Sequence, residues 1–131
     1  MRIAAAVLLV LAVSLPAADR KRKSPKPPDL EVLETSARRS EGRVAIDGRI
    51  RNSGEKTIRR LVLLFDFLAP GRAVITTQKS PIDEEILEPG KESVFRVELN
   101  DPVRAVQYQI GGVDGAGRDL RVAKAGPFAI E

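Results

Sequence analysis

The sequence predicts an all-β protein built as an antiparallel β-sandwich, and three observations lead to that prediction. Short apolar runs alternate with polar residues at a period of two, the pattern of strands that bury one face. Turn residues recur between these runs about every 8 to 14 residues. No segment after residue 28 has the periodicity of a helix.

Residues 1–18 have the layout of a secretory signal-peptide helix. Arg2 precedes an apolar run from Ile3 to Val13, and Pro16 and two alanines follow it. A basic start, an apolar middle and small residues at the exit are typical of such peptides. The run is also shorter than the roughly 20 residues that cross a bilayer. We therefore expect export to an extracytoplasmic location, either the periplasm or the medium.

A basic, proline-rich linker occupies residues 19–28. A solvated spacer is the favoured interpretation, because runs of charge are usually solvated, and contact with an anionic membrane surface is the alternative. Positive charge directly after an apolar run opposes translocation, so an uncleaved anchor with a cytoplasmic domain is the alternative to export. The basic residues are Arg20, Lys21, Arg22, Lys23 and Lys26.

The net charge of +4 belongs to the leader and linker. Six of the 22 basic residues and one of the 18 acidic residues precede residue 29, which leaves 16 basic and 17 acidic residues in 29–131. The predicted sandwich domain, residues 29–131, is therefore close to neutral, and no nucleic-acid partner is expected.

Three strand candidates lie in the first half of this domain. Leu30 to Ala37 is the first, and an alternating run from Arg43 to Arg51 is the second. The third, Thr57 to Leu68, is the most apolar, and apolar residues on both of its faces predict a central strand. The residues expected to face the core are Val44, Ile46, Ile50, Leu61, Leu63, Phe65 and Phe67.

The second half adds shorter candidates. Ala73 to Thr77 is expected to be an edge strand, and Val94 to Leu99 buries its odd-numbered residues. Val106 to Ile110 follows, and Asp114-Gly115-Ala116-Gly117 predicts a hairpin turn. A closing strand begins at Leu120 and Val122, and Phe128 and Ile130 extend it. The total is seven or eight strands.

Tyr108 lies within a strand that follows a proline turn. In an immunoglobulin-like topology it would serve as a tyrosine corner whose hydroxyl bonds to upstream backbone. The equal alternative is an ordinary tyrosine at the edge of the core.

Two motifs carry a family resemblance that covers roughly residues 30–110. Gly48-Arg49-Ile50-Arg51-Asn52-Ser53-Gly54 reads G-x-apolar-x-N-x-G, and the stretch from Leu87 to Phe95 reads L-x-P-G-x-x-x-x-F. Together with the apolar strand between them, they resemble FxLYD-type domains and related small immunoglobulin-like modules of bacterial envelope proteins. At the name-giving motif this sequence instead has Leu64-Phe65-Asp66-Phe67-Leu68. The resemblance implies an extracytoplasmic accessory or binding module without catalytic residues.

The composition argues against enzymatic chemistry. The chain has no histidine and no cysteine, which removes the usual general base, the usual thiol nucleophile and most transition-metal sites. No serine stands in a nucleophile motif. We therefore predict no catalytic, cofactor-binding or metal-binding residue and no cofactor.

Carboxylates supply the remaining candidate sites. Asp83, Glu84, Glu85 and Glu88 form the densest acidic cluster. Their spacing matches no calcium loop, so a solvated loop that guards a strand edge is favoured over a cation site. The acids of residues 114–119 likewise favour a hairpin over a calcium loop.

These observations predict a protein-binding module whose partner is another envelope protein, with no small-molecule substrate evident. Such a module would present strand edges or loops to that partner, and a strand edge could accept an extended segment by strand addition. The predicted edge, Ala73 to Thr77, is the first candidate surface.

Overall fold

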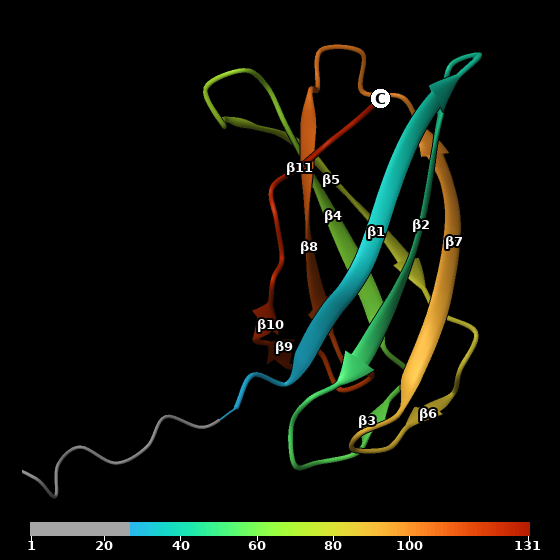
Figure 1. The fold of residues 1–131 in the computed structure, drawn as a ribbon, viewed down its shortest axis with the longest axis vertical. Coiled ribbons are helices and arrows are strands. Elements are labelled where there is room, and N and C mark those ends of the chain that lie inside the picture. The colour runs from blue at the N-terminus through green and yellow to red at the C-terminus, as the bar shows by residue number, and fades with distance from the viewer. Residues whose placement is uncertain (1–26) are drawn as a thin grey trace, which may run out of the picture.

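The computed structural model describes residues 27–131, which form eleven β-strands and no helix. Two sheets face each other across one apolar core, so the predicted β-sandwich is confirmed (Figure 1). The predicted signal peptide and the basic residues of the linker lie outside the described residues. Within residues 27–131 no helix is long and apolar enough to cross a membrane.

The first sheet has the strand order β10-β1-β2-β7. β1 and β2 are antiparallel, as are β2 and β7, whereas the short β10 runs parallel to β1. The bounds are Leu30–Ser40 for β1, Arg43–Asn52 for β2, Glu92–Asn100 for β7 and Val122–Ala123 for β10.

The second sheet has the order β11-β8-β4-β5, and β9 also pairs with β8. With β1, β2 and β7 opposite, this is the arrangement of an immunoglobulin-like sandwich. The bounds are Val62–Leu68 for β4, Val74–Pro81 for β5, Gln107–Val113 for β8, Asp119–Leu120 for β9 and Phe128–Ala129 for β11; a separate small sheet joins β3, Ile58–Arg59, to β6, Ile86–Leu87.

The period-two pattern identified the core residues correctly in the long strands. All the residues expected to face the core in β2 and around β4 are buried. Phe95, Tyr108 and Ile110 are buried as well, whereas Val97 and Leu99 in the upper half of β7 are only half-buried. β4 is central, between β5 and β8, as its two apolar faces predicted.

Two strand predictions need correction. The run from Thr57 to Leu68 is broken into β3 and β4, because Arg60 adopts a φ of 52° that no strand accommodates. The expected closing strand is also divided: β9 and β11 join the second sheet, while β10 between them joins the first. Five two-residue strands bring the total to eleven rather than seven or eight.

The two family-like motifs meet at the lower end of the sandwich. Buried Asn52 donates from Nδ2 to Lys56 O at 2.8 Å and to Leu87 O at 2.9 Å, and its Oδ1 accepts from Gly54 N at 3.0 Å. Its backbone oxygen accepts from Gly90 N at 2.8 Å. Gly90 is suited to its turn because φ there is 83°. Both motifs are therefore parts of one structural clasp.

We expect Asn52→Ala to destabilise the fold by about 2–4 kcal/mol, because it removes the three hydrogen bonds of a buried amide. Urea unfolding followed by circular dichroism measures this change. Asn100→Ala is the matched control, since Asn100 is exposed and its side chain accepts a bond from Arg43, while the bond from Gln78 to its backbone oxygen survives the substitution. Equal losses in the two variants would contradict the role of the clasp.

Candidate functional site

The sandwich is open on the side formed by β5 and β7. Each is the last strand of its sheet, and a bond of 3.0 Å from Gln78 Nε2 to Asn100 O joins them at one end (Figure 1). On the opposite side the chain's last residues close the sandwich: Arg39 N donates to Glu131 O at 3.0 Å, and Glu131 N donates to Ala37 O at 3.1 Å. The free strand edges therefore gather on one side.

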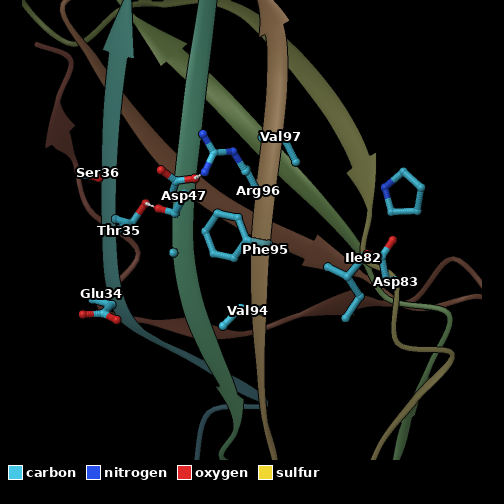
Figure 2. Close-up of a pocket in the computed structure, with 12 residues that line it drawn as sticks. Glu34, Thr35, Ser36, Asp47, Ile82, Asp83, Val94, Phe95, Arg96 and Val97 are labelled. Atoms are coloured by element: carbon cyan, nitrogen blue, oxygen red, sulfur yellow. Dashed lines mark hydrogen bonds and ion pairs between the residues drawn. The ribbon is translucent and has the colours of Figure 1, made fainter.

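A groove of about 680 Å³ runs along β7 on this open side. Figure 2 shows that its lining comes from β1, β2 and β7, with a segment at the end of β5 on the far side of β7. The lining residues are Glu34, Thr35, Ser36, Asp47, Gly48, Pro81, Ile82, Asp83, Val94, Phe95, Arg96 and Val97.

Gly48 and Phe95 form a close contact in this groove. Gly48 is opposite Phe95 in the β2–β7 ladder, and the Phe95 ring also packs against Phe65 with centroids 6.0 Å apart. A Cβ atom on Gly48 would lie 2.5 Å from both Phe95 Cζ and Glu34 O. Only glycine therefore lets the aromatic ring cross β2 and seal the core beneath the groove.

A hydrogen-bond chain links the two sheets behind the groove. Thr35 Oγ1 donates to Asp47 O at 2.9 Å and lies 2.8 Å from the Tyr108 hydroxyl. Because the threonine hydroxyl has one hydrogen, Tyr108 is the donor in the second bond. Burial raises the pKa of Tyr108, and the Asp47 carboxylate adds to the rise, although the bond to Thr35 opposes it.

This geometry decides between the two interpretations of Tyr108. A tyrosine corner would bond to backbone a few residues upstream, but Tyr108 bonds across the core to the side chain of Thr35. Its ring also packs on Phe128, with centroids 5.3 Å apart. The tyrosine-corner interpretation is wrong, and the residue is fully buried rather than at the edge of the core.

Cross-strand ion pairs cover the outer face of the first sheet. Arg49 lies 3.1 Å from Glu34 and 3.6 Å from Glu92, and Arg96 lies 3.5 Å from Asp47. These side chains are largely exposed, so each pair adds little to stability. They make the outer face beside the groove a charged surface, in which the apolar side chain of Val94 is 73% exposed.

The predicted edge near Ala73 to Thr77 is confirmed as an edge strand. Ile82 N donates to Leu61 O at 3.2 Å, and Gln78 is opposite Phe65 in the same register. These two observations show which residues of β5 direct their backbone groups toward β4. From Thr76 on, even-numbered residues of β5 bond to β4, so Thr77 and Lys79 direct their backbone groups to the free edge. The bulge after Val74 reverses this alternation, since Ala69 N donates to Ala73 O at 2.8 Å, so Val74 also faces the free edge. Val74 and Ile75 are exposed at 56% and 40%.

The acidic cluster is spread out rather than gathered. Asp83 lines the groove, and Glu85 faces Arg60 at 3.9 Å. Within the described part of the chain, no three potential metal ligands come together. Leu87, which precedes Glu88, is a buried residue of β6.

The hairpin predicted at Asp114 to Gly117 is confirmed between β8 and β9. Asp114 Oδ1 accepts from Arg118 N at 2.9 Å and from Ala116 N at 3.0 Å, and these bonds lower the pKa of the carboxyl group. An aspartate that caps its own turn in this way is a structural residue.

The groove along β7 was not among the sequence-based candidates. Alternation identifies which face of a strand is buried, but it does not reveal which strand lies at the end of a sheet. One signal was present: Val94 occupies the polar face of its strand, between Glu92 and Arg96.

Comparisons with known proteins identify the fold. No family model and no curated protein sequence matches the chain. A β-glucuronidase from Bacteroides uniformis aligns with a TM-score of 0.55 at 15% identity, over 79% of this chain and 15% of that one. Another β-glucuronidase, from glycoside hydrolase family 2, has a TM-score of 0.50 at 10% identity, over 78% and 13% of the chains. This chain thus spans about 15% of the length of the first β-glucuronidase.

The C-terminal domain of Wzt matches over a more similar length. Its TM-score is 0.50 at 12% identity, over 79% of this chain and 78% of that one. At such identities the likeness shows a shared β-sandwich fold and nothing more.

We expect Tyr108→Phe to lower stability by about 1 kcal/mol at neutral pH, because it removes one hydrogen bond and leaves Thr35 bonded to Asp47 O. The pKa of Tyr108 is raised in the folded state from an ordinary value of 10.0. The folded wild type therefore loses stability as the pH rises past about 10, and the difference between the two proteins should narrow there.

Urea unfolding at neutral and alkaline pH measures this difference. Tyr108 is the one tyrosine in the chain, so tyrosinate absorbance follows its ionisation directly. A folded-state pKa at or below 10.0 would contradict the role assigned to its burial.

Proposed function

We propose that this chain is an exported, non-catalytic module that binds another protein of the cell envelope. The observation that carries the proposal is the free edge of β5, where Val74 and Ile75 stand exposed beside unpaired backbone groups. An extended segment of a partner gains affinity from backbone hydrogen bonds along such an edge, and side-chain contacts supply its specificity. Partner binding would extend the second sheet by one strand.

The accepting stretch is short. Lys79 and Pro81 follow it in β5, and lysine and proline are residues that protect strand edges from unwanted pairing. Proline has no N–H to offer an added strand. The partner segment would therefore pair with Val74 to Thr77 and diverge from β5 before it reaches Lys79.

The absence of catalysis is argued from the residues. A chain without histidine or cysteine lacks the groups that most hydrolytic sites use for proton transfer or nucleophilic attack. The alignment with about 15% of a β-glucuronidase chain supports the view that this fold serves there as one module of a larger protein. The same module would serve here for binding.

The proposed relation to FxLYD-type envelope modules rests on the clasp. Asn52, Gly54, Leu87 and Gly90 are motif positions, and each has a structural task in the two connected turns. Such positions report shared architecture. These motif positions carry no catalytic group, so the resemblance is compatible with the proposed binding role.

The compartment is tested by fractionation with protease accessibility. An exported domain is digested in intact spheroplasts, and its leader, residues 1–18, is absent from the N-terminal sequence of the product. A domain protected in spheroplasts, still attached to its leader, would favour the alternative of a cytoplasmic domain held by an uncleaved anchor and the basic linker.

The binding surface is tested with Ile75→Lys and Thr77→Pro in the full chain, since the N–H of Thr77 faces the free edge. A photoreactive residue at Thr77 first identifies the envelope protein that contacts β5. Binding of that purified protein should then weaken about tenfold or more in both variants, because the first adds a charge and the second removes an edge N–H.

Ile86→Lys is the matched control, because Ile86 is 45% exposed and lies on β6, away from the β5 edge. It should bind like the wild type. The proposal is wrong if the identified partner binds Ile75→Lys and Thr77→Pro as well as it binds the wild type.

A further inference from the structure

The free edge of β7 exposes the backbone groups of its even-numbered residues. Asn52 N donates to Lys91 O at 2.9 Å, and Asp101 N donates to Gly42 O at 3.1 Å, so the odd-numbered positions are bonded toward β2. Antiparallel ladders alternate in this way. The N–H and C=O groups of Glu92, Val94 and Arg96 therefore point away from the sheet.

At the C-terminal end of β7, this edge is covered by side chains. Arg43 Nη2 donates to Glu98 O at 3.3 Å, and Gln78 Nε2 donates to Asn100 O at 3.0 Å. What remains open is the stretch Glu92 to Arg96, with Val94 at its centre. The groove of about 680 Å³ lies beside this stretch, which leaves room for another strand.

The open stretch is self-complementary. Glu92 and Arg96 lie two residues on either side of Val94, on the same outer face of the sheet. If a second copy of β7 runs antiparallel with Val94 opposite its own equivalent, Glu92 of each copy is opposite Arg96 of the other. Opposite charges directly across a ladder stabilise it, and the paired valines bury apolar surface between them.

We propose that two copies of this chain associate through β7 in this register, as a two-fold symmetric dimer. The first sheets of the two copies then form one continuous sheet, β1-β2-β7 joined to its symmetry mate. The even-numbered residues of the open stretch would make about six backbone hydrogen bonds between the copies.

Other registers fit less well. Centring the two-fold axis on Arg96 places the two guanidinium groups opposite each other. Moving it between Val94 and Arg96 places Glu92 opposite Glu98, and like charges directly across a ladder are destabilising. A register that pairs Arg96 with Glu98 uses the end that Arg43 and Gln78 cover. Charge and access thus select the axis at Val94.

The dimer is expected to be weak, because a single pair of strands buries less surface than a standard interface. Sedimentation velocity of the full chain, from about 1 µM to about 1 mM, should show a reversible shift from monomer to dimer. Val94→Lys places like charges at the centre of the contact and should raise the dimer Kd about tenfold or more. Val94 takes part in none of the ion pairs, so this variant leaves the outer face of the monomer intact.

Two charge variants provide the decisive test of the proposed register. Glu92→Arg gives a chain with two basic residues in the stretch, and Arg96→Glu gives one with two acidic residues. Each alone repels its own copy and should be monomeric, whereas an equimolar mixture restores both attractive pairs and should form a heterodimer. Circular dichroism confirms that each variant is folded.

Val103→Lys is the control, because Val103 is an apolar side chain at 80% exposure outside β7. It should dimerise like the wild type. The proposal is overturned by a wild-type chain that stays monomeric throughout, by single charge variants that still dimerise, or by a mixture that stays monomeric. None of these results bears on binding at β5, which uses the other sheet.

Discussion

The whole arrangement depends on how residues 119–131 cross between the two sheets. β9 and β11 extend the second sheet, while β10 pairs with β1, and the terminal Glu131 bonds to the backbone of Ala37 and Arg39. This crossing covers the outer edges of β1 and β8 and closes that side of the sandwich. The edges that stay free, β5 and β7, therefore lie together on the other side. Binding by strand addition is confined to that side, whichever partner is considered.

The open side stays ordered because its interior is locked by two contacts that carry no charge. The Phe95 ring crosses above Gly48 and reaches Phe65, so the core is sealed directly under the groove. A hydrogen bond between Tyr108 and Thr35 joins the two sheets, and Thr35 in turn donates a hydrogen bond to Asp47 O in β2. A rigid edge matters for strand addition, since a preformed edge adds no ordering cost of its own to association. The ion pairs on the outer face are too exposed to provide that rigidity.

Much of this fold follows from local pattern. Alternation correctly placed Val44, Ile46, Phe65 and Phe67 in the core, and the run from Ala73 to Thr77 lies in an edge strand, as expected. The pattern fails where strands are two residues long, because alternation needs several residues to be visible; hence the divided closing strand. It also fails where one backbone angle decides the outcome, as at Arg60, and where a side chain selects its partner across the core, as Tyr108 does. The open edge of β7 was missed because strand order is a property of the assembled sheets.

The two free edges are guarded differently, and the difference separates their proposed roles. Exposed edges invite uncontrolled pairing, so proteins limit them with charge, proline or covering side chains. β5 is limited at its lower end by Lys79 and Pro81, which leaves an apolar stretch, Val74 to Thr77, suited to an unlike partner segment. β7 is limited at its upper end by Arg43 and Gln78, which leaves a stretch whose charges are complementary only to an inverted copy of themselves. Because one stretch extends the second sheet and the other the first, a dimer formed through β7 would leave β5 of each copy free to bind a partner.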